Sequence, residues 1–252
     1  MAEVNFVVTG FAPWGSHAPL PNLTINTSWQ IANALPRVIF RHGKPDIRIL
    51  TYQTPIKASW ETARKTAPVL WEARKADYGI FVEPNHSETF HIDAMIHLGM
   101  DDDPEAPFSL EKMAYKGGFE DSDVDNKTPS EEDLTGGGAW NSCPNLLETD
   151  LHVDGILKQV LSTTHDAEIR TSTDPGRYLC AYLYYASLAA VHVRGEMKRD
   201  LFVHVPPKSG SQDIGKGVSV ISKVIEAIAD QLLDSSRGTP STSRPASDLV
   251  SK

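Results

Sequence analysis

Short apolar segments alternate along the chain with longer segments in which apolar residues recur every three or four positions. Short apolar runs between turn residues are typical of buried strands, and the longer spacing is typical of helices with one buried face. The predicted strands are residues 4–9, 47–52, 78–82, 94–98, 168–172 and 201–205. The predicted helices are residues 28–35, 59–75, 153–163, 178–193 and 214–233.

The predicted strands and helices interleave along nearly the whole chain. Such alternation predicts an α/β protein in which helices cover both faces of one sheet. We therefore assign residues 1–235 to a single domain. Two polar stretches without periodicity, residues 83–91 and 120–142, are interpreted as surface insertions. Residues 236–252 lack the apolar content needed to pack and are expected to be disordered.

Composition narrows the possible functions. The 252 residues include 24 Lys and Arg against 33 Asp and Glu, a net charge of -9, so the chain offers no basic stripe to nucleic acid or to an anionic membrane surface. No apolar run reaches the roughly 18 residues that a membrane-spanning helix needs. The first residues do not resemble an export signal, and the two cysteines fit a reducing compartment. We expect a cytoplasmic protein that binds neither nucleic acid nor membranes.

The segment 168–190 is predicted to form a strand, a tight turn and a helix. Asp174, Pro175 and Gly176 supply the turn, because proline presets its own φ and glycine tolerates a positive one. Cys180 then falls in the first turn of the helix, where free backbone N–H groups and the helix dipole stabilise a thiolate. The position suits a nucleophile, although an isolated cysteine is also typical of a small core residue.

A thiolate nucleophile needs an imidazole to hold its proton and a third group to orient that imidazole. His204 lies near the end of a predicted strand that Pro206 and Pro207 terminate. Functional groups gather at the carboxyl ends of strands in α/β sheets, so Cys180 and His204 are expected to meet there. The alternative for His204 is a structural role on its strand. Glu111 is the candidate for the third group because its surroundings in the sequence are apolar.

Five motifs stand out along the chain. They are VTGFAPWG at 8–15, INTSW at 25–29, SLEK at 109–112, STDPGRYLC at 172–180 and FVHVPP at 202–207. Their order is that of the pyroglutamyl peptidase I family of cysteine peptidases, which the chain resembles over residues 4–235. The resemblance implies a three-layer α/β/α sandwich with a mostly parallel or mixed central sheet.

The resemblance also implies an activity, the hydrolysis of the amide bond after an N-terminal pyroglutamyl residue of a peptide. Cys180 matches the nucleophile of the family, His204 the general base and acid, and Glu111 the carboxylate that orients the histidine. No metal or organic cofactor is implied. The expected partners are peptides with an N-terminal pyroglutamate, and the sequence makes no prediction of the oligomeric state.

The pyroglutamyl group is a small, flat and uncharged ring, so apolar and aromatic walls suit its pocket. By resemblance to the family, Phe11 and Trp14 form one wall of this pocket. Tyr178 and Leu179, just before the candidate nucleophile, form another part of it. A free N-terminal amine would leave an unpaired charge in such a pocket and would be rejected without any dedicated contact.

The chain departs from the family pattern at four places. Ala12 stands where glycine is usual, Trp14 where phenylalanine is usual, and Lys116 where asparagine is common. Residues 101–103 are three aspartates in a stretch that is commonly small and polar. These changes leave two alternatives open: a catalytically altered or inactive relative that binds cyclic or modified N-termini, and a thiol hydrolase of another small acyl amide. Cys143 is expected to be an exposed, inert thiol.

Overall fold

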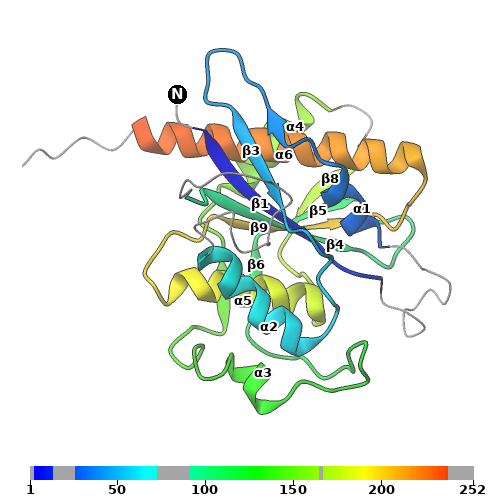
Figure 1. The fold of residues 1–252 in the computed structure, drawn as a ribbon, viewed down its shortest axis with the longest axis vertical. Coiled ribbons are helices and arrows are strands. Elements are labelled where there is room, and N and C mark those ends of the chain that lie inside the picture. The colour runs from blue at the N-terminus through cyan, green and yellow to red at the C-terminus, as the bar shows by residue number, and fades with distance from the viewer. Residues whose placement is uncertain (1–2, 14–25, 73–90, 165–166, 238–252) are drawn as a thin grey trace, which may run out of the picture.

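A mixed sheet forms the centre of the protein. The computed structural model describes residues 3–13, 26–72, 91–164 and 167–237 (Figure 1). The strands of the sheet are β1 (Val4–Gly10), β2 (Val38–Ile39), β3 (Ile47–Thr51), β4 (Ala94–Met100), β5 (Phe108–Glu111), β8 (Ile169–Ser172) and β9 (Asp200–Val205). Within the described residues they lie in the order β2-β3-β1-β4-β9-β5-β8. Two more strands, β6 (Met113–Tyr115) and β7 (Leu146–Glu148), form a separate antiparallel pair.

Strand direction changes twice across the sheet. Strands β3, β1, β4 and β9 run parallel to one another, whereas β2 is antiparallel to β3. Strand β5 is antiparallel to β9, and β8 is parallel to β5. The carboxyl ends of β8 and β9 therefore point in opposite directions. The predicted place of meeting for Cys180 and His204, a shared carboxyl edge of their two strands, was therefore wrong, because strand β5 reverses the direction of β8 relative to β9 and was not among the predicted strands.

Helices cover both faces of the sheet (Figure 1). Helices α1 (Thr27–Ala34), α4 (Val153–Leu161) and α6 (Ser211–Arg237) lie on one face, and α2 (Trp60–Glu72) and α5 (Leu179–His192) lie on the other. A short helix, α3 (Glu131–Thr135), lies outside α2 and α5. The three-layer α/β/α architecture with a mixed sheet is thereby confirmed.

Helix α5 is buried all round. Every residue from Leu179 to Val191 is buried, because the sheet covers one side of the helix and α2 with residues 113–147 cover the other. Its tyrosines need partners for their hydroxyls in this apolar setting. Tyr184 donates to the carbonyl oxygen of Glu111 at 3.0 Å, and Tyr185 donates to that of Pro144 at 2.7 Å. These bonds tie α5 to the end of β5 and to the chain before β7.

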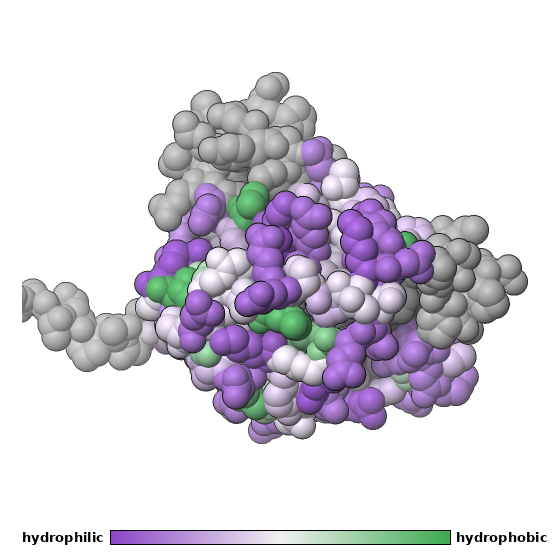
Figure 2. Space-filling view, turned by 90° about the horizontal axis from the view of Figure 1, so that it is seen from below, coloured by the Kyte–Doolittle hydropathy of each residue, from purple (hydrophilic) through white to green (hydrophobic). Residues whose placement is uncertain are grey.

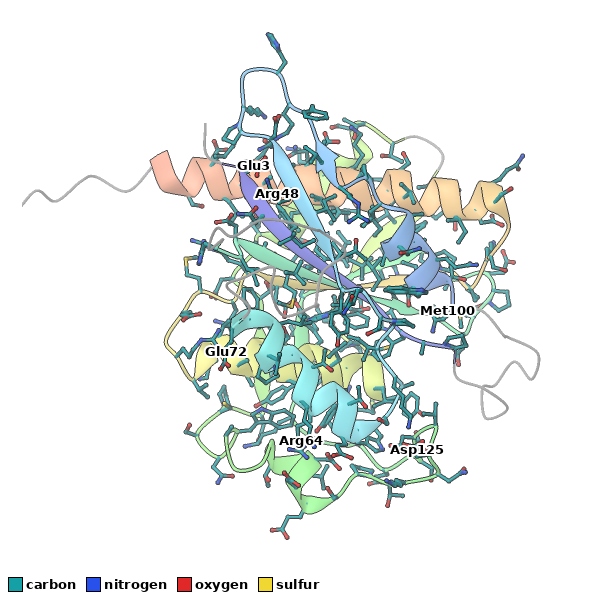
Figure 3. The ribbon with its side chains drawn as sticks, in the orientation of Figure 1. Glu3, Arg48, Arg64, Glu72, Met100 and Asp125 are labelled. Carbon is teal, nitrogen blue, oxygen red and sulfur yellow. The ribbon has the colours of Figure 1, made fainter. Side chains whose placement is uncertain are left out.

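The polar segment 120–142 is partly packed against α2 and α5. Arg64 of α2, labelled in Figure 3, pairs through Nε with Asp133 Oδ1 of α3 at 3.0 Å. Trp140 is 4% exposed and packs edge-on against tyrosines of α5. Cys143 is buried at 6% exposure, so the expectation of an exposed thiol was wrong. Its sequence neighbours are polar, and only the tertiary packing against α5 buries it.

Other predicted segments lie wholly or partly outside the described residues. The predicted strand 78–82 and most of the interpreted insertion 83–91 lie outside the described residues, as do residues 238–252. Helix α6 continues to Arg237. Within the described part of the chain, the helices lack the length or the apolar character that a membrane crossing requires. Figure 2, viewed from the α3 side, shows hydrophobic residues scattered among hydrophilic ones on that face.

Candidate active site

A tight turn delivers Cys180 to the start of α5. Gly176, in the turn after β8, has a φ of +80°, which is the left-handed conformation predicted for it. Its backbone N–H donates to Asp174 Oδ1 at 3.2 Å. The helix begins at Leu179, so Cys180 is its second residue. The side chain of Cys180 is buried at 6% exposure beneath the sheet.

The backbone around Cys180 has free hydrogen-bond donors. The first hydrogen bond of the helix runs from the Tyr182 N–H to the carbonyl oxygen of Tyr178. The N–H groups of Leu179, Cys180 and Ala181 therefore have no acceptor within the helix. These groups, at the positive end of the helix dipole, favour negative charge beside Cys180.

Gly99 of β4 makes room for the thiol. A Cβ atom on Gly99 would lie 2.8 Å from Cys180 Sγ and 2.5 Å from Cζ of Phe202. Both distances are well inside van der Waals contact, so only glycine fits between the sulfur and the sheet. Gly99 is the register partner of His204 across the β4–β9 pair. The missing side chain thus lets the sulfur lie over β4, next to the strand that carries His204.

His204 and Glu111 are joined by a short hydrogen bond. His204 Nδ1 lies 2.8 Å from Oε1 of Glu111, whose side chain is only 2% exposed. The two residues come from the antiparallel strands β9 and β5, where Glu111 is paired with Phe202, two positions before His204. The Phe202 ring packs against the imidazole at a centroid distance of 4.9 Å. The imidazole is therefore held by a carboxylate on one side and an aromatic ring on another.

The charged form of His204 is stabilised by its neighbours. Burial disfavours the imidazolium, but the hydrogen bonds to Cys180 and Glu111, together with the negative charges of these groups, outweigh burial and raise the pKa of His204 to about 10. The surroundings of His204 thus favour its protonated form. Cys180, His204 and Glu111, far apart in the sequence, are thus brought together, with His204 bonded to Glu111 and influenced by Cys180.

All three residues line one pocket of about 550 Å³. Its other walls come from the chain just after β4, from β5 and β8, from the turn before α5, and from residues 121–122. Figure 3 labels Met100, which lines the pocket at the end of β4, and Asp125, which lies in the segment 119–127. In the part of the chain that the structure describes, no group of three or more His, Cys, Asp or Glu residues could hold a metal ion.

Comparison with known proteins identifies the relatives of this chain. Human pyroglutamyl-peptidase 1 is 28% identical over 231 residues, which are 90% of this chain and 89% of that protein. The rat pyroglutamyl-peptidase 1 is 27% identical over 230 residues, with 90% and 88% of the two chains covered. The chain is therefore similar to pyroglutamyl peptidases over nine-tenths of its length. No family model matches the chain.

Solved structures share the fold. The pyrrolidone carboxyl peptidase of Thermococcus litoralis aligns with a TM-score of 0.63 at 18% identity and covers 92% of this chain and 96% of its own. Pyroglutamyl peptidase I of Bacillus amyloliquefaciens aligns with a TM-score of 0.61 at 20% identity, covering 90% and 98%. The chain therefore shares its fold with a solved pyrrolidone carboxyl peptidase and a solved pyroglutamyl peptidase I.

The residues predicted to surround the lactam ring lie in different places. Tyr178 lines the pocket, and its hydroxyl donates to the carbonyl oxygen of Ser122 at 3.0 Å. Phe11 and Leu179 are buried at 1% and 0% exposure in the core around α5, and neither lines the pocket. Trp14 lies outside the described residues.

The residues that depart from the family pattern also lie in different places. Ala12 does not adopt a positive φ; among the described residues other than glycine, only Asn126 does. Lys116 donates through Nζ to the carbonyl oxygen of Trp140 at 2.5 Å, and it lines a different cavity from that of Cys180. Asp101 and Asp102 line the pocket that contains Cys180, whereas Asp103 does not.

Sequence reasoning missed the contribution of the segment 119–127, which we name the wall segment. Asp121 and Ser122 line the pocket although they lie in a stretch interpreted as a surface insertion. The signal was weak, because an exposed aspartate and serine are typical of any polar loop. Their role depends on the contact between Ser122 and Tyr178, which joins residues 56 positions apart.

Proposed function

We propose that the protein is a cysteine peptidase that hydrolyses the amide bond after an N-terminal pyroglutamyl residue. The observation that carries this proposal is the chain of Glu111, His204 and Cys180 in one pocket, with Glu111 and His204 2.8 Å apart. The relatives named pyroglutamyl-peptidase 1 cover nine-tenths of the chain and support the choice of substrate.

Acylation begins from an ion pair of thiolate and imidazolium. The Cys180 sulfur attacks the carbonyl carbon of the pyroglutamyl residue and forms a carbon–sulfur bond. The imidazolium of His204 then gives its proton to the departing amine as the carbon–nitrogen bond breaks. Glu111 keeps the imidazole in the orientation in which Nε2 faces the reacting atoms, because its carboxylate holds Nδ1.

Charge that develops on the carbonyl oxygen needs donors. The free N–H groups at the start of α5, among Leu179, Cys180 and Ala181, are suited to this role because they lie at the positive end of the helix. The reaction then ends with hydrolysis. Neutral His204 takes a proton from water, the resulting hydroxide attacks the thioester, and free pyroglutamate and the thiolate are released.

Substrate choice follows from the chemistry of the lactam. The ring is uncharged and flat, so it can be held by Tyr178 and by backbone groups at the pocket. An open-chain N-terminal residue carries an ammonium group, and burying that charge in a site for the flat, uncharged ring costs hydration energy that the lactam does not lose. Phe11, Trp14 and Leu179 remain predicted wall residues from the resemblance to the family.

The test is release of a fluorescent arylamine from a pyroglutamyl arylamide under reducing conditions. We expect turnover by the unmodified protein and its loss in Cys180→Ala. Cys143→Ala is the matched control, because it removes the other cysteine, which lies outside the pocket. Binding of the substrate without turnover would favour an inactive relative, and turnover only of other acyl arylamides would favour a different thiol hydrolase.

A further inference from the structure

We infer that the pocket selects pyroglutamyl peptides whose second residue is positively charged, such as lysine or arginine. This inference rests on the proposed function and adds a substrate preference to it. Its basis is an excess of carboxylate groups on the walls of the pocket that Cys180 shares with His204.

Three of the carboxylates have no cationic partner within the described residues. Asp101 and Asp102 follow β4, and Asp121 lies in the wall segment. None of the three forms an ion pair in the described part of the chain; Asp101 Oδ1 accepts only the backbone N–H of Asp103, at 3.0 Å. The two groups of acidic residues thus come from separate segments and line the same cavity.

The two arginines that line the pocket are already engaged. Arg177 Nη1 lies 2.8 Å from Asp174 Oδ1, and the guanidinium also stacks over Tyr115 at 4.0 Å from the ring centroid. Arg170 donates through Nε to Ser109 Oγ at 3.1 Å. Asp174 offsets Arg177, and Glu111 is bonded to His204, so among the described residues that line the pocket Arg170 is the cation left to offset three carboxylates.

Within the described part of the chain, Glu111 adds one more carboxylate oxygen without a donor to the pocket. Oε1 of Glu111 is bonded to His204, but Oε2 is buried and no donor among the described residues reaches it. Glu111 itself is 1% exposed and lines the pocket. A buried carboxylate oxygen without a donor is a strong acceptor for a ligand N–H.

The wall segment is fixed rather than free. Asp123, 3% exposed, accepts the backbone N–H groups of Trp60, Asp125 and Lys127 at 3.2, 2.9 and 3.0 Å. The bond from Tyr178 to the carbonyl of Ser122 joins this segment to the residue that precedes α5. Asp121, the neighbour of Ser122, is thereby held at the pocket.

The negative charge of the wall segment acts on Tyr178, two positions before Cys180. Burial and the charges of Asp123, Asp121 and Cys180 together raise the pKa of Tyr178 to about 12. Asp121 is therefore close enough to act electrostatically on the residue two positions before Cys180. A cation at the same place would be attracted by the same field.

Charge at the pocket cannot serve the first residue of the substrate. The nitrogen of a pyroglutamyl residue is closed into the lactam and carries no charge, so the first cation that such a peptide can offer is the side chain of its second residue. Matching that cation to the pocket raises kcat/KM mainly through faster encounter and a lower KM. An acidic second residue is repelled by the same carboxylates.

The experiment compares three substrates, the amides of pyroglutamyl-lysyl-alanine, pyroglutamyl-glutamyl-alanine and pyroglutamyl-alanyl-alanine. We expect kcat/KM at low salt to be about ten-fold higher for the lysyl than for the glutamyl peptide, because each exposed carboxylate contributes a factor of about two to three. The ratio falls as salt is added, since the charges are exposed. Activity on the alanyl peptide tests the proposed function independently.

Two double variants make the test specific. Asp102→Asn with Asp121→Asn removes two pocket carboxylates and is expected to lower the ratio to about two. Asp103→Asn with Glu120→Gln removes two neighbouring charges that do not line the pocket and is expected to preserve the ratio. Equal rates for the lysyl and glutamyl peptides, or an equal loss in both double variants, would overturn the inference while alanyl turnover upholds the proposed function. No turnover of any of the three would overturn both.

Discussion

Gly99→Ala is the substitution that most sharply tests the position of the Cys180 thiol. The added Cβ would lie 2.5 Å from the Phe202 ring and 2.8 Å from Cys180 Sγ, whereas ordinary contacts begin at 3.4 Å. The ring would have to move by about 0.9 Å and the sulfur by about 0.6 Å. Phe202 is 0% exposed and packs against His204, so neither group has free space to move into.

A displacement of this size separates the sulfur from the imidazole. Misplacing a reacting group by about 1 Å costs about 10²-fold in rate, and overpacking a core costs about 1–3 kcal/mol of stability. We expect kcat on a pyroglutamyl arylamide to fall about 10²-fold in Gly99→Ala, with a cooperative thermal transition still present. The rate of Cys180 alkylation should change as well, because the thiolate loses its aligned imidazolium.

Gly117→Ala is the matched control. Gly117 has no atom within 4 Å of its added Cβ and no positive φ, so alanine is accommodated without strain. Its activity and unfolding free energy should stay close to those of the unmodified protein. A Gly99→Ala variant that is as active and as stable as the Gly117→Ala control would refute the placement of Cys180 Sγ over β4.

Three further predictions follow from the pKa values and from the wall segment. The arylamide rate should decline as the pH rises through about 10, because His204 loses the proton that the leaving amine needs; a constant rate up to pH 11 would contradict this. Burial raises the pKa of Asp200, which is 0% exposed, to about 8. The folded state therefore holds a proton that the unfolded chain releases near pH 4, and stability declines as the pH rises from about 4 to 8. Asp200→Asn should be more stable than the unmodified protein at pH 8, by an amount on the order of a few kcal/mol that shrinks at pH 5, as urea unfolding would measure; a gain that does not depend on pH would refute the assignment. Asp123→Asn should lose about 1–3 kcal/mol of stability, because an amide cannot accept all three backbone N–H groups, and should raise KM more than it lowers kcat. Asp125→Asn is the control at an exposed position of the same segment. Equal kcat and KM in the two variants would show that the wall segment does not contribute to substrate binding.

The hydrophobic pattern predicted most of the sheet because its central strands are short, almost wholly buried apolar runs, and it predicted α6 because one face of that helix is buried. Helix α5 differs from the other helices because it is buried on all sides, so its sequence carries almost no amphipathic signal. The turn at Gly176 was the better guide to where this helix begins. Strand β5 was not among the predicted strands, although the apolar character of its four residues singled out Glu111.

The candidate site could be predicted only in part. Residue chemistry and the resemblance to the family selected Cys180, His204 and Glu111, but their meeting depends on the reversed direction of β5 and on the space left by Gly99. Neither feature is encoded in a local pattern. The contact between Tyr178 and Ser122, which brings the wall segment to the pocket, is equally nonlocal.

Labelling with pyroglutamyl chloromethyl ketone tests the central claim most directly. A thiolate displaces the chloride and forms a stable thioether, and peptide mass spectrometry locates the modified residue. We predict one label per chain, on Cys180. Its rate of formation should be much higher than with N-acetylalanyl chloromethyl ketone, which has an open-chain group in place of the lactam ring. A label on Cys143, or none on Cys180 in the folded protein, would contradict the assignment of Cys180 as the nucleophile of a pyroglutamyl peptidase.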